Sequence, residues 1–250
     1  MNNPSSKFPN EAEVVIVGVG GIVGSMVAYW LAEMGQKNIV GLEKSTIIPS
    51  DIASTAHASD FVYNTTHDKL GCWATNFSRK FYEDNGFFLK KGGLEICRTD
   101  DDARWEELKR KVESGKAFGT NVRLISAAEA KEKFPLLDEG SIRGAMWDPD
   151  AGLVTPRSQD VVNFAVETAK DKGALKTFTD TPATGFEIEG GRITGVKTEK
   201  GLIRTNKVVI TSGIWGPLMG DMAGVPVPLM PVEHPLLFFG PLPEIQGTEE

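Results

Sequence analysis

The sequence predicts an α/β fold built around a parallel sheet, and three segments carry this prediction. The first is an apolar, β-branched run at residues 14–17, which passes through four glycines into residues with helical spacing. The second is the apolar run 38–42, which ends at the acidic residue Glu43. The third is a late series of segments with period two between residues 176 and 205, followed by an apolar strand at 208–211. We therefore expect a strand–turn–helix–strand unit at the start of the chain. The apolar strand at 208–211 is then expected to join the same sheet.

The turn after the first strand has the features of a dinucleotide-binding site. Its glycines allow a tight turn and close approach of a pyrophosphate, which the N–H groups and dipole of the following helix would bind. The G-x-G-x-x-G pattern is one residue too long here, so we assign its roles to Gly18, Gly20 and Gly24, and the extra residue to Gly21. Glu43 lies nineteen residues after Gly24, where a carboxylate accepts hydrogen bonds from the adenosine ribose and disfavours NADP. An ordinary glycine-rich turn is the alternative.

Apolar residues at three- and four-residue steps predict two helices. The first begins after the glycine turn, and Gly35 is expected to end it. Residues 44–68 are rich in small polar residues and predict an irregular loop that crosses the cofactor. The second helix carries a mostly aromatic stripe, which we expect to face the core. The two stripes consist of Val23, Val27, Trp30, Leu31 and Met34, and of Leu70, Trp73, Phe77 and Phe81.

Residues 92–150 contain no new phosphate-binding turn and predict the start of an α+β domain that covers the substrate. A glycine pair at 92–93 leads into a strand. Three aspartates from Asp100 open a helix that the basic run 109–111 closes, because the helix dipole favours acidic residues first and basic residues last. The basic run is expected to face solvent. Ser126 then caps a short helix.

After residue 151 the chain is expected to return to the first domain. Thr155 and Pro156 predict the cap and first residue of a helix that ends at Gly173. Four strands with period two follow, and the middle two form a hairpin through a glycine pair at 190–191. The strand at 208–211 is then expected to be buried. A β-meander before a last parallel strand is typical of flavoproteins rather than of plain NAD dehydrogenases. The four strands are residues 176–179, 184–189, 192–198 and 202–205.

The composition excludes several other classes of protein. A net charge of −7 over 250 residues argues against nucleic-acid and anionic-membrane partners, which need clustered Lys and Arg. Cys72 and Cys97 provide neither a disulfide framework nor a metal-ligand spacing, so no metal site is predicted. No run approaches the roughly 20 apolar residues of a membrane span. The first twelve residues lack the features of a signal or transit peptide, so a cytoplasmic location is expected.

Taken together and in order, seven short segments resemble the dimethylglycine and sarcosine dehydrogenase/oxidase group. This group belongs to the FAD-dependent amine oxidoreductases with the D-amino-acid-oxidase fold. The resemblance runs from about Glu11 to the last residue. Its segments are the Val-Ile-Val-Gly turn with Glu43, Ser54–Ala58, Gly92–Glu95, Phe134–Leu137, Asp148–Leu153, Thr211–Gly216 and Pro231–His234.

The resemblance implies an FAD-binding dinucleotide fold with a parallel sheet and a β-meander crossover, together with part of an α+β substrate domain. On this basis residues 1–91 and 151–220 belong to the FAD-binding domain, and 92–150 and 221–250 to the substrate domain. The implied reaction is oxidation of a small N-methylated amine, of the sarcosine or dimethylglycine type, by hydride transfer to tightly held FAD. The iminium product then hydrolyses or passes its one-carbon unit to folate. The electron acceptor is not identified.

The resemblance also assigns two histidines. Many members bond a histidine in the loop after the second strand covalently to the flavin, and the matching residue is His57, although Ser59 and Asp60 depart from the pattern that usually follows. His234 matches a histidine near the substrate amine, and an imidazole exchanges protons with an amine near neutral pH. A solvated His57 and a structural His234 beside a proline are the alternatives.

The remaining cofactor contacts also come from the resemblance. Ala183 is expected to touch the adenine through its backbone, and Gly213 to let the last strand approach the cofactor closely. The other residues assigned to the cofactor are Lys44, Ser54, Thr55 and Trp215. Flavin domains of the family continue beyond the position of Glu250, so a truncated FAD-binding fragment without catalysis is one alternative function. An NAD-dependent enzyme is the other.

Overall fold

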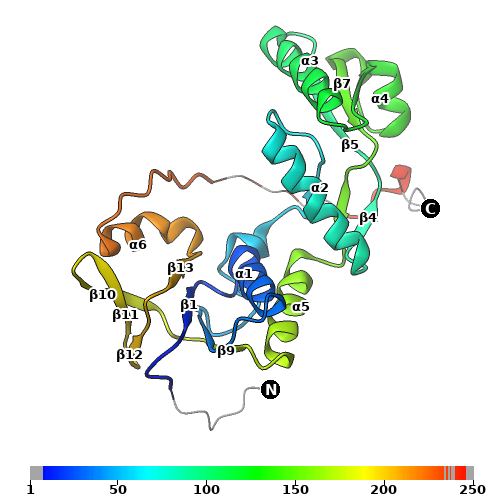
Figure 1. Ribbon diagram of the computed structural model, residues 1–250. Helices are drawn as coiled ribbons and strands as arrows, with labels where there is room; N and C mark the ends of the chain where they lie inside the picture. Colours follow the sequence, from blue (N-terminus) through cyan, green and yellow to red (C-terminus); the bar gives the residue numbers. More distant parts are fainter. Residues whose placement is uncertain (1–7, 234, 236, 238–239, 246–250) are drawn as a thin grey trace. The chain divides into compact units, whose positions relative to one another are not determined.

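The computed structural model describes residues 8–233, 235, 237 and 240–245 (Figure 1). The chain divides into two compact units, residues 1–58 with 157–235 and residues 59–156 with 236–250, which we call the first and the second unit. The chain passes from one unit to the other after residues 58, 156 and 235. The domain boundaries predicted from the sequence, at residues 91, 150 and 220, stay predictions.

A four-stranded parallel sheet forms the centre of the first unit, which confirms the predicted α/β class. Its strands are β1 (Val14–Val17), β2 (Ile39–Leu42), β9 (Leu175–Phe178) and β13 (Val208–Ile210), in the order β13-β1-β2-β9. All three pairings are parallel. The prediction that the last strand is buried was wrong, because β13 lies at the edge of the sheet and Ile210 is 36% exposed.

Helices α1 (Ile22–Glu33) and α5 (Ser158–Asp171) pack against each other and against one face of this sheet (Figure 1). The predicted stripe on α1 was wrong at its ends, since Val23 and Met34 are 61% and 78% exposed. The residues of α1 that are fully covered are small, Ala28 and Ala32 among them. Small side chains allow a helix to approach both a sheet and a second helix closely, and periodicity alone does not reveal this requirement.

Helix α5 begins at Ser158 with Arg157 as its N-cap, two residues later than predicted. Thr155 still follows the preceding strand, because its N–H donates a hydrogen bond of 3.0 Å to the carbonyl of Phe87. The predicted end is confirmed, since Gly173 follows the C-cap with φ of +64°.

The predicted meander is present on the other face of the sheet. Strands β10 (Ala183–Glu189), β11 (Arg192–Thr198) and β12 (Gly201–Arg204) form an antiparallel sheet. The hairpin turn uses Gly190 and Gly191, both with positive φ, as a type I′ turn requires. Side chains of the meander pack on those of β1 and β2, and the chain then continues through β13 into the short turn η3 (Gly213–Trp215) and helix α6 (Gly216–Ala223).

The described residues of the second unit form two three-stranded sheets and three α-helices. One sheet has the order β3 (Phe61–Val62), β8 (Gly152–Val154), β4 (Phe88–Lys90), and the other β5 (Gly93–Arg98), β7 (Ile142–Asp148), β6 (Arg123–Ser126). Helices α3 (Asp102–Ala117) and α4 (Ala127–Lys133) pack on residues that alternate along β7 and therefore cover its opposite faces. Ser126 caps α4 as predicted, and α2 spans Lys69–Asp84.

Two predictions about helix surfaces in this unit were wrong. Of the stripe predicted on α2 only Phe81 is buried, whereas Leu70, Trp73 and Phe77 are 72%, 62% and 48% exposed. Spacing identifies residues that share a face but not whether another element covers that face, and Trp73 and Phe77 stack on each other instead. Helix α3 does not end at the basic run but continues to Ala117. The run faces solvent only in part, since Arg110 is exposed whereas Lys111 is buried and bonds to Glu95.

None of the helices among the described residues is long and apolar enough to span a membrane.

Candidate dinucleotide-binding site

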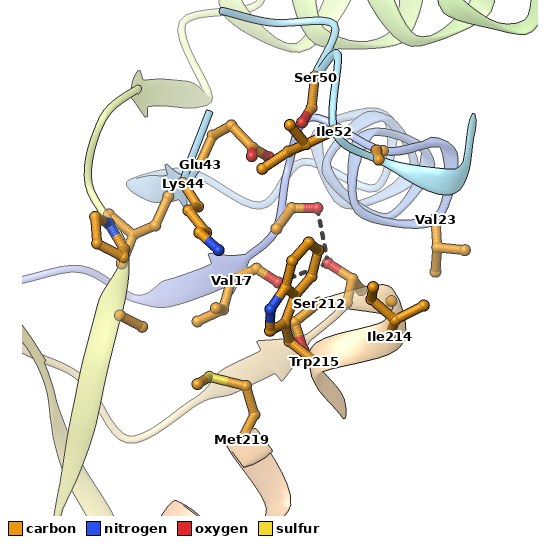
Figure 2. A pocket seen from close by; sticks show the side chains of 18 of the residues that line it. Val17, Val23, Glu43, Lys44, Ser50, Ile52, Ser212, Ile214, Trp215 and Met219 are labelled. Atoms are coloured by element: carbon orange, nitrogen blue, oxygen red, sulfur yellow. Dashed lines mark hydrogen bonds between the residues drawn. The ribbon is translucent and has the colours of Figure 1, made fainter. Parts of the chain in front are cut away.

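A cavity of about 520 Å³ lies within the first unit, where β1, β2 and β13 end (Figure 2). Its size is typical of a small-molecule site, and its position at the carboxyl ends of parallel strands is where α/β sheets bind ligands. Of the twelve residues predicted to contact the cofactor, nine line it. They are Gly18, Gly21, Glu43, Lys44, Ser54, Thr55, Ala183, Gly213 and Trp215.

Gly18 and Gly24 are required by backbone packing around the turn. Gly18 has φ of +93°, and a Cβ there would lie 2.7 Å from the carbonyl oxygen of Thr211. A Cβ on Gly24 would lie 2.3 Å from the carbonyl oxygen of Gly18, so α1 approaches the end of β1 as closely as the backbone allows. Gly18 lines the cavity, whereas Gly24 lies behind it.

Gly20 contacts Glu43. Its N–H donates a hydrogen bond of 2.9 Å to Oε2 of Glu43, and the N–H of Ser45 donates one of 2.9 Å to Oε1. Glu43 is 5% exposed, so these bonds fix the orientation of a buried carboxylate at the cavity wall. Each carboxylate oxygen keeps a second acceptor position, which suits the two hydroxyls of a ribose. Gly20 itself does not line the cavity, and a Cβ on it would lie 2.5 Å from Oε2 of Glu43.

The irregular spacing of the glycines is accommodated by a pair of residues that the sequence did not identify. Val19 takes the position of the first glycine when the pattern is counted back from Gly24, and its side chain is fully buried. It packs over Gly41 of β2, where an added Cβ would lie 2.9 Å from Val19 Cγ1. A valine is therefore possible in the turn because the neighbouring strand carries a glycine opposite it.

The N-terminus of α1 opens beside the cavity. Gly21 is its N-cap and makes no side-chain capping bond, and the first turn of the helix carries no acidic residue. The N–H of Ile22 donates a hydrogen bond of 3.0 Å to Oγ1 of Thr55, which lies on the short helix η1 (Ser54–His57). The positive end of the helix dipole therefore remains available to an anion.

Lys44 and Trp215 add a cationic and an aromatic side chain to the cavity wall. Nζ of Lys44 lies 4.3 Å from the centre of the Trp215 ring, and Figure 2 shows the two side chains next to each other. Lys44 follows β2, whereas Trp215 ends η3, so the pair joins segments far apart in the sequence. Ala183 at the start of β10 and Gly213 at the start of η3 also line the cavity.

Besides Gly20 and Gly24, two predicted residues are not placed at this cavity. His57 is the last residue of η1, is exposed and does not line the cavity. His234 lies outside the described residues.

Part of the wall was not predicted from the sequence. Ile52, Ile214, Leu218 and Met222 give it an apolar side, and Ser50 and Ser212 contribute hydroxyl groups. Ser212 lies within the segment Thr211–Gly216 that carries the family resemblance, whereas no signal in the sequence distinguishes Ser50 from the other serines of its loop.

Comparisons with known proteins give a consistent result. A family model described as FAD dependent oxidoreductase matches residues 13–249. Human mitochondrial sarcosine dehydrogenase is 30% identical over 244 residues, which cover 92% of this chain and 26% of that protein. Human mitochondrial dimethylglycine dehydrogenase is 29% identical over 251 residues, which cover 98% of this chain and 28% of that protein. The chain therefore spans about a quarter of the length of these curated relatives.

Among solved structures, the crystal structure of L-proline dehydrogenase from P. horikoshii superposes with a TM-score of 0.77 and 33% sequence identity. The match covers 87% of this chain and 57% of that chain.

Proposed function

This chain belongs to the family of FAD-dependent oxidoreductases, and from this premise we propose that it binds FAD and takes part in oxidising the C–N bond of an N-methylated glycine. The observation that carries the proposal is the convergence of nine predicted cofactor residues on one cavity. The names of two relatives, sarcosine and dimethylglycine dehydrogenase, support this class of substrate.

The residues present fit an FAD. A dinucleotide needs acceptors for ribose hydroxyls, donors for a pyrophosphate and an apolar surface for its rings. Glu43 offers the acceptors, and the uncapped N-terminus of α1 together with Lys44 offers positive charge. The hydroxyl groups of Ser50 and Ser212 are buried at the wall and have no partner among the described residues, as expected where a ligand completes the hydrogen bonding.

In this proposal, the residues have separate roles in binding FAD and in the reaction. Gly20 and Ser45 hold the Glu43 carboxylate in position for the ribose, and Thr55 orders the first turn of α1 near the pyrophosphate. The side chains of Ile214 and Leu218, which are 48% and 49% exposed and line the cavity, offer apolar surface for a ring of the cofactor to cover. When bound, FAD supplies the acceptor for the hydride that leaves the carbon next to the amine nitrogen. His234 is proposed to exchange the amine proton.

The test is the visible spectrum of the purified protein after addition of FAD and removal of the excess. A flavin band that bleaches on anaerobic addition of sarcosine or dimethylglycine supports the proposal, with glycine, which lacks the N-methyl group, as the control. A flavin band that none of these amines bleaches would favour a cofactor-binding module without catalysis. Binding of NAD with no retained flavin would favour an NAD-dependent enzyme.

Covalent attachment of the flavin to His57 and a cytoplasmic location remain proposals. The exposed position of His57 at the end of η1 leaves its ring accessible for a bond to flavin. Two relatives carry "mitochondrial" in their names, so fractionation of cells that express the protein is the appropriate test of location.

A further inference from the structure

We propose that Ser50 and Ser212 bind the ADP part of the dinucleotide through their hydroxyl groups, from the two sides of the glycine turn. The inference rests on the proposed function, because it assumes that a dinucleotide occupies the cavity. It adds two residues that neither the glycine pattern nor the family resemblance assigned to the cofactor.

Ser50 lies next to Glu43. The serine is 2% exposed, and its Oγ has no hydrogen-bond partner among the described residues. Its N–H donates a hydrogen bond of 3.0 Å to the carbonyl of Gly20, which anchors the backbone of this loop to the turn. A Cβ on Gly20 would lie 2.8 Å from Cβ of Ser50 and 2.5 Å from Oε2 of Glu43, so all three residues meet at one point. Figure 2 shows the Ser50 and Glu43 side chains approaching each other at the cavity.

Ser212 lies on the opposite side of the turn, next to Gly18. A Cβ on Gly18 would lie 3.2 Å from Cα of Ser212. Ser212 is the N-cap of η3, a position where a serine hydroxyl usually accepts a hydrogen bond from the backbone, yet it makes no such bond. Its Oγ is also buried and without a partner among the described residues.

Thr55 and Thr211, two of the threonines in the wall, provide the contrast. Oγ1 of Thr55 accepts a hydrogen bond from Ile22, and Oγ1 of Thr211 donates to the carbonyl oxygens of Val17 and Gly18. The fold itself therefore uses these two hydroxyls, whereas those of Ser50 and Ser212 have no partner in the part of the chain that the structure describes. A buried hydroxyl without a partner destabilises the ligand-free protein, and a ligand that pairs with it removes this cost. The phosphate oxygens and ribose hydroxyls of ADP are suitable partners.

The experiment compares Ser50→Ala and Ser212→Ala with Ser25→Ala in the full chain. Ser25 is buried in α1, does not line the cavity, and its hydroxyl donates a hydrogen bond of 3.0 Å to the carbonyl of Ile22. Dissociation constants for FAD and for ADP are measured by fluorescence titration, and the melting temperature is measured without ligand.

For Ser50→Ala and Ser212→Ala we expect a rise of roughly tenfold in the Kd for both ligands, as for loss of one hydrogen bond to a charged or polar group. Their ligand-free melting temperatures should equal or exceed that of the wild type. Ser25→Ala should show the reverse, a lower melting temperature and unchanged Kd values.

Wild-type affinity for FAD in both serine variants would overturn the inference, and so would a ligand-free melting temperature as low as that of Ser25→Ala. A loss confined to FAD, with ADP affinity unchanged, would also overturn it, because the hydroxyls would then serve the flavin part. If the wild-type chain binds neither FAD nor ADP, the proposed function fails together with the inference.

Discussion

The backbone N–H of Gly20 and the carboxylate of Glu43 are joined by a hydrogen bond of 2.9 Å that links the glycine turn to the end of the second strand. The residues are 23 positions apart in the sequence. This bond makes the acidic residue part of the turn, so the pyrophosphate and ribose positions of the proposed site are set by a single buried contact.

Replacing Glu43 with alanine is therefore expected to affect both the fold and the ligand. The N–H groups of Gly20 and Ser45 would lose their acceptor, which should reduce the free energy of unfolding by about 1–3 kcal/mol. Loss of the ribose contact should weaken FAD binding as well. Urea unfolding and FAD titration measure the two effects. Glu13→Ala, at an exposed glutamate of the same unit, is the control and should leave FAD affinity unchanged. An unaltered FAD affinity in Glu43→Ala would refute the assigned role.

Gly20→Val should abolish flavin retention, because its side chain would displace Glu43 and Ser50 rather than meet the pyrophosphate directly. The adjacent Gly21→Ala is a matched control for folding, since its Cβ would make ordinary contacts of 3.7 Å with Ala53 and Thr55. We expect Gly21→Ala to keep the wild-type melting temperature and Gly20→Val to lower it. Equal flavin retention by Gly20→Val and wild type would contradict this account.

The Val19 and Gly41 pair predicts a reciprocal effect. Gly41→Ala should destabilise the protein by about 1–3 kcal/mol, the usual cost of overpacking, because the new methyl would lie within 3.0 Å of three Val19 atoms. Adding Val19→Ala to this variant should recover part of the loss. Urea unfolding of both single variants and the double variant gives the coupling energy. Additive effects would show that the two side chains do not compete for one space.

His57 provides a test of covalent attachment. Acid-precipitated protein should keep its yellow colour, and the peptide that contains His57 should carry the mass of the flavin. His57→Ala should release all flavin into the supernatant while the native protein still binds FAD, since His57 does not line the cavity. Release of all flavin from the wild type would rule out the bond and leave FAD binding intact.

Asp150 predicts a pH dependence in the second unit. The Lys90 ammonium at 2.6 Å, with the Asn121 amide at 2.8 Å, holds the pKa of this carboxyl below its usual range. Because the pKa is lower in the folded state, the stabilisation is present above the unfolded pKa of about 3.9 and is lost as the pH falls through the folded pKa. The urea midpoint of Asp150→Asn should lie below that of the wild type at pH 7, and the two should converge as the pH falls through the folded-state pKa of Asp150. Asp171→Asn, at an exposed position in the first unit, is the control.

The sequence by itself determined the elements around the site. The spacing of apolar residues, at every second position or at helical steps, predicted the parallel sheet, the meander and most helices. Burial of one face imposes these periods on each local stretch of chain. The glycines and Glu43 also predicted where the proposed dinucleotide site lies, since tight backbone packing and a fixed carboxylate leave a compositional signal. The family resemblance, rather than any spacing in the sequence, assigned three further residues to the same site, namely Lys44, Ala183 and Trp215.

Only the tertiary structure decided which surfaces are covered and which polar groups are paired. The stripe of Leu70, Trp73 and Phe77 has helical spacing, yet it is exposed, because burial depends on what packs against a face. In the same way, Ser50, Ser212, Thr55 and Thr211 are similar small hydroxyl residues in the sequence. Within the described part of the chain, long-range contacts supply hydrogen-bond partners to the threonine hydroxyls and none to the two serine hydroxyls, so the distinction exists only after folding.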